Sequence, residues 1–76
     1  MQIVRTVTAS AVKQFHLRDK KITIETEHQP QPGDLVLCTL GDSGIELLGM
    51  FTGPWVLRPE KAWPIAQVTI KGVIIG

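Results

Sequence analysis

A small all-β domain is the fold class that the sequence predicts, on three observations. The chain has 76 residues, which is enough for one domain with one thin core. Seven valines, eight isoleucines and seven threonines are β-branched, and such side chains lose rotamer freedom in helices but pack well on pleated sheets. Clusters of glycine, proline and polar residues at 29–34, 41–44 and 52–54 divide the chain into short segments of strand length. Residues 1–76 are therefore expected to form a single, mainly β domain.

The N-terminal half is predicted to hold two strands joined by a short helical segment. Residues 2–8 are few and rich in β-branched types, which favours a strand. Residues 9–18 carry apolar side chains at the i, i+3, i+4 spacing of a helix, so we expect one or two turns there with Ser10 near the N-cap. Residues 21–27 alternate polar and apolar side chains, which is the clearest strand pattern in the chain.

The C-terminal half is predicted to begin with a β-hairpin. Residues 35–40 are a nearly unbroken apolar run, as expected of a strand that is covered on both faces. The turn residues 41–44 separate this run from a second strand at 45–51.

The remainder of the chain is predicted to add a short strand and a longer closing strand. Residues 55–58 resume the sheet briefly, and two prolines then bracket a loop that carries Trp63. Residues 67–75 form the closing strand, with Gly72 as its bulge.

Charge and cysteine content exclude several kinds of site. Eight basic and seven acidic side chains leave a net charge of +1, which argues against direct binding to nucleic acid or anionic lipid. The single cysteine, Cys38, can form no disulfide within the chain, and His16 and His28 stand at no zinc-ligand spacing with it. We therefore expect no metal, no cofactor and no disulfide framework.

Localisation and oligomeric state follow from size and apolar content. No segment reaches the roughly 18 consecutive apolar residues of a membrane span, so the sequence predicts a cytoplasmic protein without a membrane partner. Isolated domains of this size that lack a disulfide or a metal are often marginally stable, which favours self-association. The expected state is a homodimer.

Several short motifs follow one another in a distinctive order. They are Gln31-Pro32-Gly33-Asp34-Leu35-Val36-Leu37, the Gly41-Asp42 turn, Val56-Leu57-Arg58-Pro59-Glu60, Trp63-Pro64-Ile65 and Ile70-Lys71-Gly72-Val73-Ile74-Ile75-Gly76. This order resembles the C-terminal domain of LexA-type repressors and UmuD-type proteins, and Leu17-Arg18-Asp19 extends the resemblance upstream over the whole chain. It implies a compact, strongly bent antiparallel β fold, called a β-clip, that dimerises. It also implies a Ser–Lys dyad that cleaves the protein's own chain at an upstream small-residue–Gly bond.

Only the serine of that dyad has a counterpart here. Ser10 matches the nucleophile, whereas Glu46 stands where the resemblance puts the lysine. A glutamate is mainly a carboxylate at pH 7 and is a much weaker base toward a serine than a neutral amine. Lys13 and Lys71 match no position of the family pattern, and the chain has no Ala-Gly or Cys-Gly bond to cut. We therefore expect no enzyme activity, with Ser10 and Glu46 as vestiges of the dyad.

The preferred hypothesis is a non-catalytic LexA/UmuD-like dimerisation or protein-interaction module. On the resemblance, its partner would be a host or phage repressor or a UmuD-like protein, and its origin a phage or a plasmid, with an effect on transcription regulation or the SOS response. One alternative is a residual serine peptidase that acts in trans through Ser10. The other is a small β-barrel nucleic-acid binder that uses Trp55, Trp63 and the Lys20-Lys21 pair.

The dimer interface is expected on the closing strand. If the family geometry applies, exposed apolar side chains there, such as Val73 and Ile75, are the interface candidates. The sequence names no particular partner and gives no symmetry for the dimer.

Overall fold

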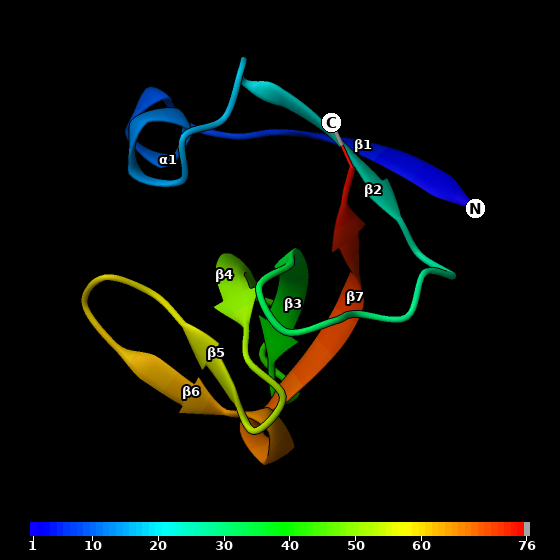
Figure 1. Ribbon diagram of the computed structural model, residues 1–76, viewed down its shortest axis with the longest axis vertical. Coiled ribbons are helices and arrows are strands. Elements are labelled where there is room, and N and C mark those ends of the chain that lie inside the picture. Colours follow the sequence, from blue (N-terminus) through cyan, green and yellow to red (C-terminus); the bar gives the residue numbers. More distant parts are fainter. Residues whose placement is uncertain (76) are drawn as a thin grey trace.

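The computed structural model describes residues 1–75, which hold one sheet of seven antiparallel strands (Figure 1). The strands are β1 (Gln2–Thr6), β2 (Lys21–Glu25), β3 (Leu35–Leu40), β4 (Glu46–Phe51), β5 (Trp55–Leu57), β6 (Ala62–Pro64) and β7 (Val68–Ile74). The short helix α1 (Ala9–Gln14) joins β1 to β2, and a single 3-10 turn, η1 (Ile65–Gln67), precedes β7. The predicted all-β, antiparallel fold with little helix is confirmed.

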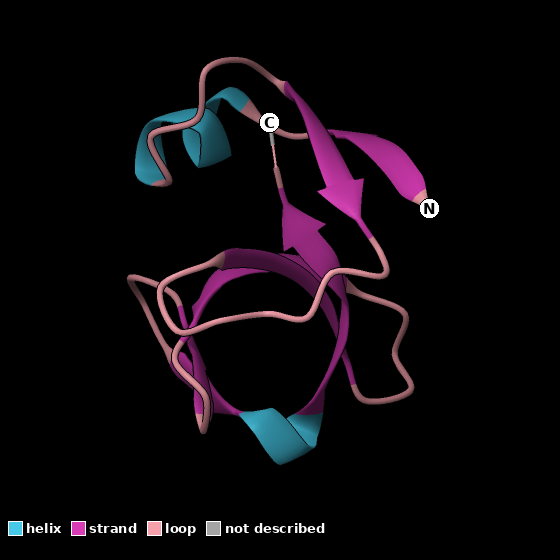
Figure 2. Cartoon of the chain, turned by 45° about the vertical axis from the view of Figure 1, so that its right-hand side comes forward, coloured by secondary structure: helices cyan, strands magenta, loops and turns pink. Residues whose placement is uncertain are grey.

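The last strand lies in the middle of the sheet, whose order is β1-β2-β7-β3-β4-β5-β6. β7 pairs with β3 along most of its length but with β2 only through Ile74 and Val73, opposite Ile24 and Glu25. The C-terminal strands curl around in the lower half of the view, while α1, β1 and β2 lie above them (Figures 1 and 2). The sheet is therefore strongly bent at the short β2–β7 junction.

Two apolar clusters lie on opposite faces of β3. Alternate residues of a strand point to opposite faces, so Leu37 enters one cluster while Val36 and Cys38 enter the other. The first cluster is built from Ile22, Ile24, Leu37 and Leu48, and the second from Val36, Cys38, Val56 and Val73. The expectation that residues 35–40 are covered on both faces is confirmed.

Helix α1 is held by its cap and by two apolar contacts. The side-chain oxygen of Thr8, the N-cap residue, accepts a hydrogen bond from the amide of Ala11 at 3.1 Å. Ala11 and Phe15 pack against the first cluster. Ser10 is the second residue of the helix and is exposed, so Thr8 takes the capping role expected near Ser10.

The expectation of a loop around Trp63 is wrong. Ala62–Pro64 form β6, and Trp63 pairs with Val56 of β5. Proline is tolerated there because β6 is an edge strand, where a missing amide breaks no ladder.

The bulge of β7 lies one residue before the expected position. Leu37 pairs with Gly72 and Cys38 with Ile70, so Lys71 is the extra residue. Gly72 has a different role, since a Cβ there would lie 2.6 Å from Cγ2 of Ile24 and 2.7 Å from the carbonyl oxygen of Glu25. Only glycine lets β2 approach β7 this closely.

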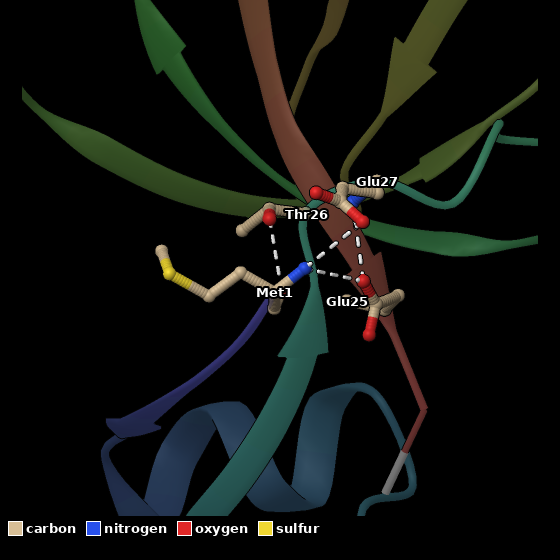
Figure 3. A network of polar contacts seen from close by, with 4 residues as sticks. All are labelled: Met1, Glu25, Thr26 and Glu27. Atoms are coloured by element: carbon tan, nitrogen blue, oxygen red, sulfur yellow. Dashed lines mark hydrogen bonds and ion pairs between the residues drawn. The ribbon is translucent and has the colours of Figure 1, made fainter.

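Ion pairs tie the start of β1 to the end of β2 (Figure 3). The Met1 amine lies 3.0 Å from Oε1 of Glu25 and 3.4 Å from Oε2 of Glu27. The Met1 carbonyl accepts hydrogen bonds from the amide and the hydroxyl of Thr26, at 2.9 and 2.8 Å. The Glu25 hydrogen bond raises the pKa of the Met1 amine, and the same bond lowers the pKa of the Glu25 carboxyl.

Candidate functional site

A pocket of about 270 Å³ opens between the β1–α1 junction and the β3–β4 hairpin. Its apolar floor belongs to the first core cluster and consists of Val7, Ala11, Phe15, Leu37 and Leu48. Its polar rim consists of Arg5, Thr6, Thr8, Glu46 and Arg58. Since this pocket contains Glu46, it is the candidate site.

Arg5 and Glu46 form a bidentate ion pair on the rim. Nε of Arg5 lies 3.2 Å from Oε1 of Glu46, and Nη2 lies 3.4 Å from Oε2. The two side chains are 41% and 35% exposed, so solvent screens the pair. Both carboxylate oxygens of Glu46 are nevertheless engaged by the Arg5 guanidinium. This arrangement fixes Glu46 as a hydrogen-bond acceptor.

The second arginine of the rim is also paired. Nε of Arg58 lies 2.9 Å from Oε1 of Glu60, in the turn that follows β5. Both guanidinium groups of the rim therefore have a carboxylate partner.

The hydroxyl group that reaches this pocket is not the one expected. Ser10 is exposed on α1 and does not line the pocket, whereas Thr8 does. The side-chain oxygen of Thr8 is already used as the helix cap. The two lysines considered as substitute bases, Lys13 and Lys71, are exposed and line no part of the pocket. Ser10 and Glu46 are thus not brought together in one site.

The pocket is small for a ligand site. Pockets for drug-sized ligands occupy about 300–1,000 Å³. The volume of about 270 Å³ lies just below that range.

The two interface candidates differ in position. Val73 is 4% exposed and belongs to the second core cluster, because it pairs with Val36 on one side and Glu25 on the other. The expectation that Val73 is exposed is wrong. Ile75 is 51% exposed and lines a shallow depression beside residues 16–18.

The residues suggested for nucleic-acid binding are spread over the sheet. Trp55 is exposed on β5, whereas Lys20 and Lys21 lie at the start of β2, with β7, β3 and β4 between these strands. Trp63 is half-buried, and Nζ of Lys61 lies 3.9 Å from the centroid of its ring. One face of Trp63 is therefore already occupied by a cation.

Sequence reasoning identified Glu46 but missed its partners in the pocket. Arg5 belongs to a strand pattern and Thr8 to a run of small polar residues, and neither carries a motif. Serine and threonine are both good N-cap residues, so residue type alone does not distinguish Thr8, the observed cap, from Ser10.

Within residues 1–75, no three His, Cys, Asp or Glu side chains gather in a way that could hold a metal ion. No helix in this part of the chain is long and apolar enough to cross a bilayer. Comparisons with models of protein families and with curated proteins find no match to this sequence.

Proposed function

We propose that this chain is a non-catalytic relative of the LexA/UmuD-type domain, with a β-clip fold, that acts as a dimerisation or protein-interaction module. A bent antiparallel sheet is what the resemblance implies, and the observed sheet supports the proposal. The partner we propose is a repressor or a UmuD-like protein of the host or of a phage.

The Arg5–Glu46 pair is the observation that best supports a non-catalytic role. A serine nucleophile needs a base within hydrogen-bond reach, which is about 2.6–3.2 Å. Both oxygens of Glu46 instead face the Arg5 guanidinium, and Ser10 lies outside the pocket that holds Glu46. A binding role is the function that such a site supports.

Exposed apolar side chains support an interaction role. Met50 and Leu57 face each other across β4 and β5, and Trp55 lies two residues from Leu57 on the same face. These three side chains are each at least 40% exposed. Contiguous apolar patches on a small protein mark interaction surfaces, because leaving them in water is unfavourable.

The test combines solution mass with partner binding. Light scattering across a concentration series should give twice the 8.4 kDa chain mass at the highest concentrations. Titration into a fluorescently labelled LexA-type repressor and a labelled UmuD-type protein should give saturable binding to at least one of them. A chain that is monomeric throughout and binds neither protein would overturn the proposal.

A peptidase control completes the test. The same repressor is incubated with wild-type chain and with the Ser10→Ala and Thr8→Ala variants, and its cleavage is followed on gels. We expect no cleavage by any of the three proteins. Cleavage by the wild type that disappears in either variant would show catalysis and exclude a purely binding role.

A further inference from the structure

Strand β1 is one edge of the sheet, and only about half of its backbone amides and carbonyls form hydrogen bonds to β2. The Met1 carbonyl accepts from the Thr26 amide and the Val7 amide donates to the Lys20 carbonyl, so odd-numbered residues bond to β2. The amides and carbonyls of Gln2, Val4 and Thr6 therefore point away from β2. By the alternation of an antiparallel ladder, the β1–β2 hydrogen bonds bypass these three residues.

The edge formed by Gln2, Val4 and Thr6 lacks most of the devices that usually protect a sheet edge. Protected edges carry proline, charged side chains or a bulge, or are very short. The opposite edge, β6, is three residues long and contains Pro64, which has no amide to donate. β1 has five residues, a regular register and neither proline nor a bulge, its one charged side chain, Arg5, is paired with Glu46, and Val4 at its centre is 57% exposed.

We infer that the β1 edge joins two copies of this chain, which pair antiparallel about Val4 into one continuous sheet. This inference rests on the proposed function as a dimerisation module. Val4 would face Val4 of the second copy, and Gln2 would face its Thr6. Each such pair can exchange two backbone hydrogen bonds. The edge is self-complementary because its outward-pointing residues lie symmetrically about Val4.

Charge is compatible with a second copy in this orientation. Gln2, Val4 and Thr6 are uncharged, so no like charges meet directly across the new pairing. Residues 25–27 at one end of β2 carry two carboxylates beside the Met1 amine, and residues 20–21 at the other end carry two lysines. Antiparallel pairing places the acidic end of one β2 level with the basic end of the other, roughly 14 Å away across the two β1 strands, whereas parallel pairing would align like ends.

The carbonyl of Val4 has one competing contact. Nη1 of Arg5 donates to it at 3.3 Å, which is a long hydrogen bond. A carbonyl oxygen has two lone pairs and can accept a second bond from the partner strand. A five-residue edge also buries much less than the roughly 800 Å² per partner of a standard interface. We therefore expect a dimer that dissociates on dilution.

The experiment exploits the position of Val4 opposite its own copy. Val4→Glu and Val4→Lys each place like charges face to face, and each should raise the dimer dissociation constant at least about tenfold. An equimolar mixture of the two variants should dimerise again, because the opposite charges then meet. Ile45→Glu, which changes another exposed β-branched residue outside β1, is the matched control and should leave the dissociation constant unchanged. Sedimentation equilibrium gives the constants, and circular dichroism checks that each variant is folded.

The outcomes separate this inference from the proposed function. A wild-type dimer that persists in both Val4 variants but is lost in Ile75→Asp would overturn the β1 interface and leave the dimerisation module in place. A wild type that is monomeric but binds a repressor would also overturn only the β1 interface. A wild type that neither dimerises nor binds a partner would overturn both. Loss of the dimer in both Val4 variants with recovery in the mixture would establish the β1 interface.

Discussion

Arg5 and Glu46 are 41 positions apart in the chain, yet Nε of Arg5 lies 3.2 Å from the carboxylate of Glu46. The contact joins the edge strand β1 to the start of β4, which are not neighbours in the sheet. It is possible because the bent sheet brings the β1–α1 junction over the β3–β4 hairpin, where the two side chains share one pocket. The pair therefore links the two halves of the fold across the candidate site.

A charge-reversal cycle tests this link. Glu46→Lys replaces the pair by two cations and should lower the free energy of unfolding by roughly 0.5–1 kcal/mol, because the attraction is lost and repulsion is added. The double variant Arg5→Glu, Glu46→Lys restores opposite charges and should recover most of that loss. Urea unfolding of the wild type, both single variants and the double variant measures the coupling. A coupling energy of zero would mean that the two side chains act independently.

Gly72→Ala should be strongly destabilising for a different reason. The added methyl group would meet Ile24 and the backbone of Glu25, and a backbone neighbour cannot rotate out of the way. We expect a loss of roughly 1–3 kcal/mol in the free energy of unfolding, as for overpacked cores. Thermal and urea unfolding give the value. Lys71→Ala is the matched control, since Lys71 is the exposed bulge residue next to it, and it should change stability by less than about 0.5 kcal/mol.

The strands were predictable from local patterns, because each pattern reflects burial on one or both faces. Alternation at 21–27 marked the buried Ile22 and Ile24, and the apolar run at 35–40 marked a strand between two clusters. The segment around Trp63 was not predictable, because proline reads as a strand breaker unless the strand lies at a sheet edge. Edge position depends on the strand order, which local patterns do not contain.

The candidate site was less predictable than the fold. Glu46 was singled out only because it stands where a related pattern has a lysine, and its partner Arg5 depends on a contact across the bent sheet. Val73 was expected on the surface, but β7 is central and its alternate side chains enter the second cluster. In both cases the missing information was which distant strands lie side by side.

Cys38 should be unreactive in the folded protein. Its side chain is fully buried in the second cluster, and burial raises the pKa of the thiol, with a smaller opposing effect from Arg58. The thiolate is the reactive form, so reaction with a disulfide reagent at pH 8 should be at least about 100-fold slower in buffer than in concentrated urea. Absorbance of the released thiol dye measures both rates. Similar rates with and without urea would place Cys38 at the surface.

The ion pair between the Met1 amine and Glu25 predicts a stability contribution with two pH limits. The Glu25 carboxyl has its pKa lowered from the ordinary 4.5, chiefly by the hydrogen bond from the amine, so its contribution is complete above pH 4.5. That contribution is lost as the pH falls through the lowered value. The amine has its pKa raised from 8.0, chiefly by Glu25, so its contribution is complete below pH 8.0 and is lost as the pH rises through the raised value.

The melting temperature of the wild type should therefore exceed that of Glu25→Gln by a constant amount between pH 4.5 and 8.0, and the difference should shrink on either side. A synthetic chain acetylated at Met1 is the control for the alkaline limit. Acetylation removes the positive charge of the Met1 amine, so the melting temperature of the acetylated wild type should lie close to that of Glu25→Gln at every pH. Because both groups are at the surface, 0.5 M salt should also reduce the difference. A difference that is the same from pH 3 to pH 10 would show that the Glu25 side chain stabilises the fold independently of its charge.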